Sequence, residues 1–349
     1  MQTAIVIVSF NGRKWLGQCL KSCQTCAPDV PIYVVDNAST DGSAEIAATF
    51  PEVTLLRQEL NRGFAGGNNA GLRAALNDGA EAVMLLNQDA VLSEGCLPAL
   101  EKYLAEHPQV AGVQPAIMLP DGRVNSLGNS FHFLGFGESG GSGLSLAEAQ
   151  AKLPWLKHNT EPPYLSGAAV LLRAEALKQA GLFYEELFMY HEDLELSLRL
   201  RVAGWQLAVA PQVKVIHFYE PARSRKQYYY MERNRLIVWY EVFSWRTVCL
   251  LLPIYLIAEP ILLLMSVAQG WLGEKLHSYG YFFRAGSWLH IMVARRRIKR
   301  LRCVSDKHLM ALAAARISYQ TGPTAFITRW FWNPLSSLAW AVFKPLIRW

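Results

Sequence analysis

Three carboxylates stand within four positions of the segment Tyr190–Arg199, where the pattern predicts the start of a helix. The simpler interpretation is that these acidic side chains stabilise the positive end of that helix. The alternative is that one of them faces a cleft as a general base, since a carboxylate can take the proton of an attacking hydroxyl group. Glu192 and Asp193 are the candidates for that role.

Another carboxylate, Asp89, ends the polar triplet Asn87–Asp89 that follows the apolar segment Ala82–Leu86. An aspartate after a strand is usually a turn residue, but this position also suits a hard divalent cation such as Mg²⁺ or Mn²⁺. Such a cation is held by one or two carboxylates, and the oxygens of a diphosphate complete its shell. His217 follows the strand-like segment Val213–Ile216. A single histidine is usually structural, but its place after the end of a strand favours a functional role.

The segment Asp36–Ser43 offers carboxylate and amide groups directly after the apolar segment Ile32–Val35. Asp36 and Asn37 can bond a nucleobase or a ribose hydroxyl group. The competing interpretation is a turn that leads into a helix, since Asx residues and glycine commonly form turns, and Asx and serine residues commonly cap helices. The residues themselves leave both interpretations open.

The segment Asn61–Gly71 is rich in glycine and precedes a predicted helix. Glycine lets backbone N–H groups approach an oxygen-rich ligand, and a helix N-terminus favours phosphate. The segment has neither the dinucleotide-binding pattern nor the P-loop pattern. On its own it is therefore a weak signal for nucleotide binding.

An alternation of short strands and helices in the first ninety residues must position these groups. The predicted strands are Ala4–Val8, Ile32–Val35, Val53–Leu56 and Ala82–Leu86, and the predicted helices are Gly12–Cys23, Ser43–Thr49 and Asn68–Leu76. This alternation predicts an α/β fold with a mostly parallel sheet and helices on both faces. Ligands of such sheets bind at the carboxyl ends of the strands, where the polar segments lie.

The last part of the chain differs in composition from the rest. From residue 241 onward the sequence has fourteen Lys or Arg against four Asp or Glu, and eight of the eleven Trp follow residue 238. Basic residues mixed with Trp are typical of a membrane interface. This composition favours an anionic membrane surface over nucleic acid as the partner.

The segment Val248–Val267 is almost continuously apolar and is about long enough to span a bilayer. Pro253 and Pro260 interrupt it, and Glu259 lies near its middle. A central carboxylate in a spanning helix costs about 2.5–3.5 kcal/mol. The sequence therefore allows either a crossing or a bent segment that lies in one leaflet.

Taken in series, these segments resemble the inverting family 2 glycosyltransferases of the GT-A fold, and most closely their bacterial rhamnosyltransferase-like branch. The resemblance covers roughly residues 3–240. The motifs that carry it are Val8–Asn11, Asp36–Ser43, Asn61–Gly71, Asn87–Asp89, Leu165–Gly167, Glu192–Leu196 with Arg199, Gly204–Trp205, His217 and Arg233–Arg235.

The sequence departs from the family pattern at three positions. Asn87 takes the first place of the family's Asp-x-Asp motif, which leaves Asp89 as the main carboxylate for a metal. Glu195 takes the last acidic place of the Glu-Asp-x-Asp-Leu motif. Asn37 replaces the usual second aspartate after the second strand, so a contact with the base that differs from the family pattern is expected.

The resemblance implies a GT-A catalytic domain over residues 1–240 and a helical, membrane-associated region over residues 241–349. It implies Asp193 and Glu192 as catalytic residues, and Asp89 and His217 as ligands of Mg²⁺ or Mn²⁺. The residues implied to bind the donor nucleotide are Ser9, Phe10, Asn11, Asp36, Asn37, Asn68, Asn69, Asn87 and Gln88, with Arg233 and Arg235 on its diphosphate.

The implied reaction is sugar transfer from a nucleoside diphosphate, with rhamnose from dTDP-rhamnose as the first expectation and a UDP-sugar as the second. The expected acceptor is a lipid-linked sugar, lipopolysaccharide or polysaccharide. The protein is expected to act at the cytoplasmic face of the inner membrane as a peripheral or monotopic protein. A nonenzymatic protein that binds membranes or polyanions is the alternative. A sugar nucleotidyltransferase is disfavoured, because Ser9–Asn11 replaces the basic glycine-rich loop expected after its first strand.

Overall fold

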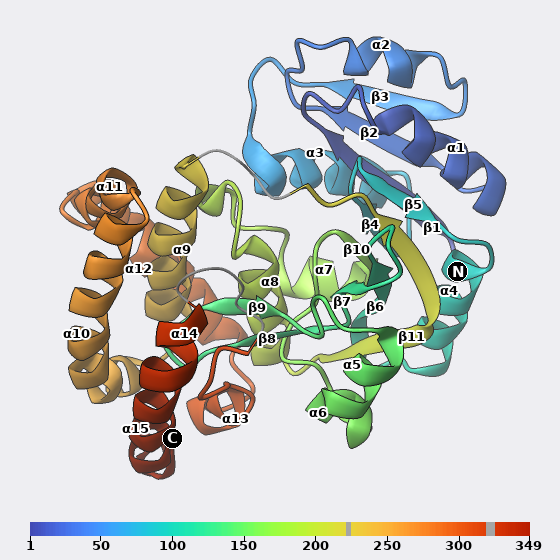
Figure 1. Ribbon diagram of the computed structural model, residues 1–349. Coiled ribbons are helices and arrows are strands. Elements are labelled where there is room, and N and C mark those ends of the chain that lie inside the picture. The colour runs from blue at the N-terminus through green and yellow to red at the C-terminus, as the bar shows by residue number, and fades with distance from the viewer. Residues whose placement is uncertain (221–224, 319–324) are drawn as a thin grey trace. The chain divides into compact units, whose positions relative to one another are not determined.

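The computed structural model describes residues 1–220, 225–318 and 325–349 (Figure 1). The chain divides into two compact units. The first comprises Met1–Asn129, Ser139–Leu200 and Trp205–Glu220, and the second comprises Ser130–Glu138, Arg201–Gly204 and Pro221–Trp349. The boundary expected at residue 240 falls inside α9 (Lys226–Val242), a helix of the second unit.

A mixed sheet forms the centre of the first unit, with strand order β3-β2-β1-β4-β10-β6-β11-β5 and with β7 paired to β6. Its strands are β1 (Thr3–Ser9), β2 (Ile32–Asp36), β3 (Val53–Arg57), β4 (Ala82–Leu86), β5 (Ala90–Leu92), β6 (Val110–Met118), β7 (Val124–Ser126), β10 (Ala169–Arg173) and β11 (Gln206–His217). The first four strands pair in parallel as predicted, whereas β10 runs antiparallel to β4 and β6. The α/β prediction is confirmed, with more antiparallel pairing than expected.

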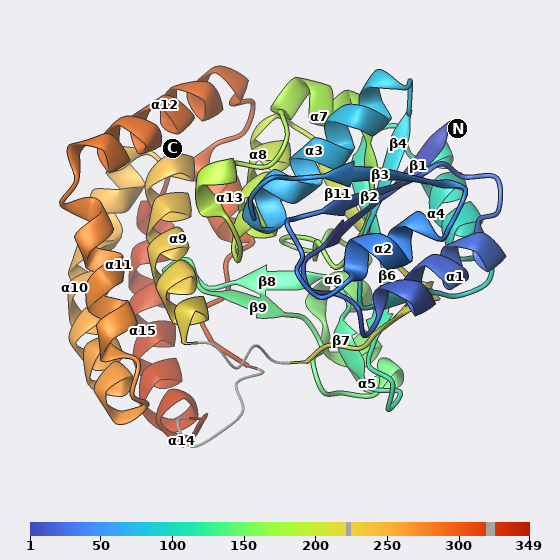
Figure 2. The ribbon, with the colours of Figure 1, turned by 90° about the horizontal axis from the view of Figure 1, so that it is seen from above.

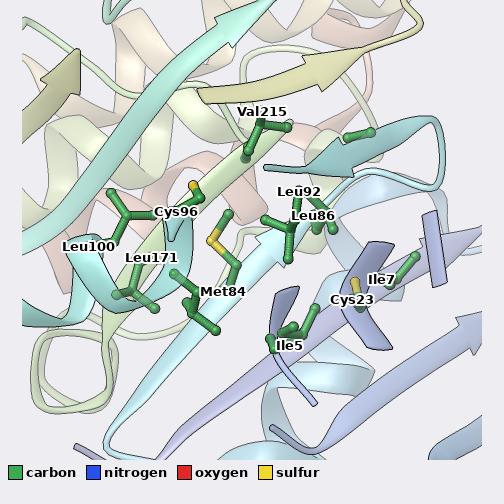
Figure 3. Close-up of a cluster of buried hydrophobic side chains, with 14 of the residues drawn as sticks. Ile5, Ile7, Cys23, Met84, Leu86, Leu92, Cys96, Leu100, Leu171 and Val215 are labelled. Atoms are coloured by element: carbon green, nitrogen blue, oxygen red, sulfur yellow. The ribbon is translucent and has the colours of Figure 1, made fainter. Parts of the chain in front are cut away.

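Helices cover both faces of this sheet. They are α1 (Leu16–Cys26), α2 (Ser43–Ala48), α3 (Gly63–Asn77), α4 (Cys96–Glu106), α5 (Leu146–Lys152), α6 (Pro154–Lys157), α7 (Ala174–Ala180) and α8 (Glu192–Val202). Ile5 and Ile7 of β1 face one core, which includes residues of α1 and α4 (Figure 3). Ala4 and Val6 face the other core, with α3, α7 and α8, as the two-residue period of a strand requires.

The glycine-rich segment forms the first turns of α3, and the helix begins at Gly63 rather than at the predicted Asn68. Its glycines serve close packing of the helix on β1. A Cβ atom on Gly71 would lie 2.4 Å from Cγ1 of Val6, and one on Gly67 would lie 2.6 Å from Cγ1 of Val8. The glycines therefore allow the helix to approach the strand closely.

The second unit is mainly helical. Its helices are α9, α10 (Trp245–Ala268), α11 (Leu272–Phe282), α12 (Ala285–Leu301), α13 (Asp306–Ala311), α14 (Ala325–Ile327) and α15 (Asn333–Phe343), with a π-helical turn at Thr328–Trp332. Figures 1 and 2 both show α9, α10 and α11 side by side. A short two-stranded ladder joins β8 (Asn129–Phe131) and β9 (Gly137–Ser139).

A buried cluster of charges joins α9, α10 and α11. The carboxylate of Glu259, in the apolar helix α10, lies 2.7 Å from the guanidinium of Arg235 and 2.8 Å from Nζ of Lys275. Glu232 pairs with the same two cations. Two cations thus neutralise two carboxylates, and the central carboxylate of α10 points into the helix bundle.

Candidate active site

A buried arginine fixes the helix that carries the predicted catalytic carboxylates. Arg199 of α8 uses all five of its N–H donors within the chain. Two donors reach the carboxylate of Glu195, at 2.7 Å each, and both residues are 2% exposed. The other three reach the successive backbone carbonyls of Ala180, Gly181 and Leu182. These bonds hold α8 against the end of α7.

Asp193 lies in the first turn of α8, and two backbone N–H groups hold its carboxylate. Gly167 donates to Oδ2 at 3.3 Å, and Leu194 donates to Oδ1 at 2.8 Å. A Cβ atom on Gly167 would lie 2.9 Å from the ring of Phe64, so this position has little room for a side chain. Two motifs that are separate in the sequence therefore meet at the Asp193 carboxylate.

A strained turn leads into α8. Phe188, Tyr190 and His191 have φ angles of 62°, 64° and 67°, a region that residues other than glycine rarely adopt. The carbonyl of Phe188 accepts a hydrogen bond of 3.0 Å from the N–H of Ala65 in α3, which holds the turn in place. Clustered backbone strain of this kind is typical of functional sites.

The surroundings of Asp193 suit a general base. Burial raises the pKa of Asp193 to about 6, and the backbone N–H groups counteract only part of this effect. Burial and then the charge of Asp193 raise the pKa of Glu192 well above its ordinary range. At neutral pH Asp193 is therefore ionised yet basic enough to take a proton, and the surroundings of Glu192 disfavour its charged form as well.

The reversed direction of β10 brings Asp193 to the carboxyl edge of the parallel strands. Because β10 is antiparallel to β4, its first residue lies beside the last residue of β4. The N–H of Asn87 then donates to the carbonyl of Ala168 at 2.9 Å, and the preceding Gly167 bonds Asp193. The polar triplet after β4 and the carboxylate of Asp193 thus share one edge of the sheet.

The same edge brings together the two predicted metal ligands. Oδ1 of Asp89 lies 3.2 Å from Nε2 of His217, because β5 follows Asp89 and pairs with the end of β11. Nδ1 of His217 lies 2.9 Å from Oδ1 of Asn125, and Nδ2 of Asn87 lies 3.4 Å from Nε2. The histidine is therefore oriented from both sides of its ring.

This geometry fits a pair of cation ligands. The bond between Asn125 and Nδ1 of His217 orients the ring so that Nε2 faces the carboxylate of Asp89. Histidines that bind metals are commonly oriented by such a bond on the other ring nitrogen. The described residues contain no group of three or more His, Cys, Asp or Glu placed to hold a metal. Oxygens of a ligand or of water would complete the shell of a cation here.

The loops that follow β1, β2 and β4 are joined into one rim. The N–H of Asn11 donates to Oγ of Ser39 at 3.0 Å, and Oδ1 of Asn11 accepts from the N–H of Thr40 at 2.9 Å. Gln88 pairs in both directions with the backbone of Phe10, at 3.0 and 3.3 Å. These bonds therefore tie three of the predicted nucleotide-binding residues into the rim: Phe10, Asn11 and Gln88.

Two buried polar atoms at this rim make no hydrogen bond to a described residue. They are Oγ of Ser9 and Oδ1 of Asp36, whose residues are paired at the ends of β1 and β2. An unsatisfied buried polar group costs about 1–3 kcal/mol, so natural proteins keep few of them. Their position at the carboxyl edge of parallel strands is where a polar ligand binds in such sheets.

Three predicted nucleotide ligands are engaged by the chain itself. The side-chain amide of Asn37 makes three hydrogen bonds with residues 61–63 at the start of α3. Asn68 bonds a carbonyl one turn earlier in its own helix, and Asn69 bonds the backbone of Phe183 in both directions. These asparagines shape the loops around the rim, and their contact with a nucleotide remains a prediction.

The predicted diphosphate ligands belong to the second unit. Arg235 is 1% exposed and forms ion pairs with Glu232 and Glu259, so a diphosphate would have to displace two buried partners. Arg233 bonds the side chain of Asn234 and lies over three tyrosine rings, at 5.1–5.3 Å. The contact of these arginines with a donor remains a prediction.

Sequence reasoning missed Asn125. It lies in β7, which has no motif, and only the pairing of β7 with β6 brings it beside the end of β11. The motif that contains Arg199 was recognised from the sequence, but the structural role of Arg199, an ion pair with Glu195, was not predicted. An (i, i+4) spacing to Glu195 was the available signal for an ion pair.

The chain is similar to known glycosyltransferases. A family model described as "Glycosyltransferase like family 2" matches residues 1–237. An N-acetylglucosaminyl-diphospho-decaprenol L-rhamnosyltransferase of Mycobacterium tuberculosis is 31% identical over 232 residues, which are 61% of this chain and 75% of that protein. The dTDP-rhamnosyl transferase RfbF of Shigella flexneri is 25% identical over 193 residues, which are 53% of this chain and 59% of that protein.

Solved structures share the fold. GalNAc-T7, crystallised with UDP, GalNAc and Mn²⁺, has a TM-score of 0.55 at 15% identity, and the match covers 68% of this chain and 47% of that one. This chain therefore spans about half the length of GalNAc-T7. Residues 1–349 of S. aureus TarS, in complex with UDP-GlcNAc, have a TM-score of 0.50 at 15% identity, with 99% of this chain and 89% of that chain covered.

We expect Asp193→Asn to stabilise the folded chain at pH 8 by about 2–3 kcal/mol, because the pKa of about 6 exceeds the value of about 3.9 for a free aspartate. A raised pKa adds stability at low pH, and that stability is lost as the pH rises through 6. The gain should disappear below about pH 4, where the unfolded aspartate is protonated too. Urea unfolding from pH 4 to 8 measures this, with the exposed Asp29→Asn as control; equal effects at both ends would contradict it.

Proposed function

The chain belongs to glycosyltransferase family 2, and on that premise we propose that it transfers a sugar from a nucleoside diphosphate to an acceptor hydroxyl group with inversion of configuration. The observation that carries this proposal is the Asp193 carboxylate. It is oriented by two backbone N–H groups, has a pKa of about 6, and shares a sheet edge with the polar triplet after β4.

The reaction follows from this placement in one displacement. Asp193 takes the proton of the acceptor hydroxyl group as its oxygen attacks the anomeric carbon. The bond from that carbon to the diphosphate breaks on the opposite face, so the configuration inverts and the chain needs no covalent nucleophile. Burial, and then the charge of Asp193, raise the pKa of the neighbouring Glu192, so its surroundings disfavour a second negative charge beside the base.

The rim of loops around β1, β2 and β4 is the proposed site of the donor nucleotide. Oγ of Ser9 and Oδ1 of Asp36 are the buried groups that a ribose or a nucleobase would satisfy, with Phe10, Asn11 and Gln88 beside them. We propose dTDP-rhamnose as the donor and a UDP-sugar as the second candidate. The names of the two rhamnosyltransferase relatives support the first.

Asp89 and His217 would hold a divalent cation, with Asn125 orienting the histidine. A bound Mg²⁺ or Mn²⁺ would neutralise the charge of the departing diphosphate. The donor set of one carboxylate and one imidazole leaves most of the coordination shell to diphosphate and water oxygens, which suits a hard cation.

The proposed acceptor is a lipid-linked sugar or a growing polysaccharide at the cytoplasmic face of the membrane. The apolar helix α10 supports this, since it is the one helix in the described part of the chain that is long and apolar enough to cross a bilayer. Only 33% of the most apolar 18-residue stretch of α10 is buried within the protein. The side chains of Leu256, Ile257 and Leu264 are each more than half exposed. Exposed apolar surface of this kind marks an interaction site.

Asp193→Asn should lower kcat by about 10²–10⁴-fold and leave donor affinity nearly unchanged, because the general base is lost while the nucleotide rim is intact. The assay is release of dTDP from dTDP-rhamnose with a synthetic prenyl-diphosphate N-acetylglucosamine as acceptor. Wild-type kcat/KM should rise with pH through about 6, the pKa of Asp193. Wild-type turnover in Asp193→Asn and its loss in Glu192→Gln would reverse the two roles, and no release with any donor would favour a nonenzymatic protein.

Substitution of the proposed cation ligands should abolish metal binding, and this loss can be measured without an activity assay. In the presence of dTDP, Mn²⁺ should raise the melting temperature of the wild type by linkage, and Asp89→Ala or His217→Ala should remove this shift. Asn125→Leu should weaken Mn²⁺ binding about 10–100-fold, since it releases the ring that it orients. Full transfer activity in excess chelator would exclude the cation.

Polar substitution of the exposed face of α10 should release the chain from membranes. The triple variant Leu256→Asn, Ile257→Asn and Leu264→Asn lowers the free energy gained by burying these side chains in a membrane by about 1.5–3 kcal/mol each. It changes no residue of the charge cluster around Glu259. Flotation with phosphatidylcholine vesicles measures binding, and Leu60→Asn, at an exposed position of the first unit, is the control. Equal flotation of the triple variant and the wild type would contradict membrane contact through α10.

A further inference from the structure

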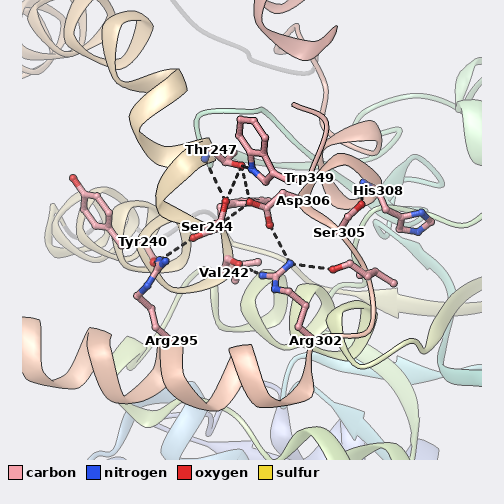
Figure 4. Close-up of polar contacts among 12 residues, drawn as sticks. Tyr240, Val242, Ser244, Thr247, Arg295, Arg302, Ser305, Asp306, His308 and Trp349 are labelled. Atoms are coloured by element: carbon pink, nitrogen blue, oxygen red, sulfur yellow. Dashed lines mark hydrogen bonds and ion pairs between the residues drawn. The ribbon is translucent and has the colours of Figure 1, made fainter. Parts of the chain in front are cut away.

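A pocket of about 720 Å³ lies in the second unit where α9 ends and α10 begins, facing the last turns of α12 (Figure 4). Its lining holds five basic side chains against two carboxylates, Glu241 and Asp306. The basic residues are Arg246, Arg295, Arg296, Lys299 and Arg302. Such an excess of cations around a cavity favours an anionic ligand.

Two of the arginines build the walls of the pocket. Arg295 donates to the backbone carbonyls of Tyr240 and Phe243, and Arg302 donates to that of Val242 (Figure 4). These are carbonyls at the end of α9, which have no partner within the helix. The two guanidinium groups are therefore committed to the corner between α9 and α10 and give the pocket a rigid frame.

The carboxylate of Asp306 is also committed to this frame. One oxygen accepts a hydrogen bond from Arg302 at 3.0 Å. The other accepts bonds from the N–H of Ser244 at 2.7 Å and from Oγ1 of Thr247 at 2.6 Å, at the start of α10. Asp306 is thus paired with Arg302, and Glu241 is the other side-chain carboxylate of the lining, so the five cations outnumber the carboxylates by three.

Three cations of the lining remain exposed: Arg246, Arg296 and Lys299. None of them forms an ion pair with a residue that the structure describes. Two tryptophans of the lining flank the basic groups, since the guanidinium of Arg295 lies 4.3 Å over the ring of Trp245 and that of Arg246 lies 5.9 Å from the ring of Trp349. Indole rings beside cations are typical of a site at the headgroup level of a membrane.

We propose that this pocket binds the phosphate or diphosphate headgroup of an anionic lipid through Arg246, Arg296 and Lys299. A phosphate monoester or a diphosphate offers several acceptor oxygens and more than one negative charge, and three cations in the lining of one pocket suit it better than a singly charged diester. The apolar exposed face of α10, which begins at this pocket, gives the lipid chains a surface beside the headgroup. Only the lipid source rests on the proposed membrane contact; the anion site itself does not.

The test compares two triple variants of the full chain that remove the same charge. One carries Arg246→Gln, Arg296→Gln and Lys299→Gln in the pocket. The matched control carries Arg300→Gln, Lys307→Gln and Arg348→Gln, which are exposed residues of the same unit outside the pocket lining. All six side chains are exposed, so both variants should keep the melting temperature of the wild type within a few degrees.

The probes are phosphatidylcholine vesicles with phosphatidic acid, the same vesicles with phosphatidylglycerol at matched total charge, and soluble pyrophosphate. The wild type and the control should bind phosphatidic acid vesicles about tenfold more tightly than phosphatidylglycerol vesicles, and the pocket variant should lose this preference. Equal weakening of both variants on both vesicles would show diffuse surface charge only and would overturn the proposal.

The pyrophosphate arm separates the two sources of the anion. If pyrophosphate raises the melting temperature of the control more than that of the pocket variant, the pocket takes soluble phosphates as well as headgroups. If only the vesicles distinguish the variants, the ligand is the lipid headgroup. If neither probe distinguishes them, the pocket is not an anion site. The sugar-transfer proposal is tested separately, because Asp193→Asn should bind all three probes as the wild type does.

Discussion

The first unit depends on the complete burial of one guanidinium group. Arg199 can leave water only if each of its five donors finds an acceptor, since an unpaired buried charge costs about 3–5 kcal/mol. One carboxylate and three successive carbonyls supply those acceptors. Because these hydrogen bonds join α8 to the carbonyls at the end of α7, they fix the position of α8 relative to α7. The position of Asp193, one helical turn and a half before Arg199, follows from it.

The surroundings of the Asp193 carboxylate lower the free energy of unfolding at neutral pH. The surroundings that raise the pKa of Asp193 disfavour its ionised form, which is the form that can take a proton. The turn before α8 adds three residues with positive φ angles, each costing about 1–3 kcal/mol. The chain keeps both features because Arg199 and the hydrogen bond from Gly167 over-determine the local geometry. Substitution at Asp193 is therefore an unusual case in which loss of a buried group should leave a more stable fold.

The sequence predicted the parallel half of the sheet and the motifs of the site, because strand alternation and turn residues are local signals. It predicted Asp89 and His217 as partners only through the family resemblance, and their contact depends on β5 pairing with β11 across more than one hundred residues. The antiparallel β10 and the role of Asn125 had no local signal at all. The glycines of the segment Asn61–Gly71 are a weak signal for nucleotide binding in the sequence, whereas in the structure Gly67 and Gly71 allow α3 to pack closely on β1. Composition cannot distinguish those two uses.

The carboxylate of Glu259 shows how an apolar helix can carry charge without exposing it. In the sequence this residue argues against a straight membrane crossing, since a lone carboxylate in hydrocarbon is costly. In the second unit it faces Arg235 and Lys275, and Glu232 balances the remaining charge, so the cluster is formally neutral. The carboxylate of α10 is thus enclosed by the helix bundle, while Leu256 and Leu264 are exposed on the helix. A helix whose carboxylate is paired inside a bundle and whose exposed side chains are largely apolar has the arrangement of an element that lies along an apolar surface, and less that of one surrounded by it.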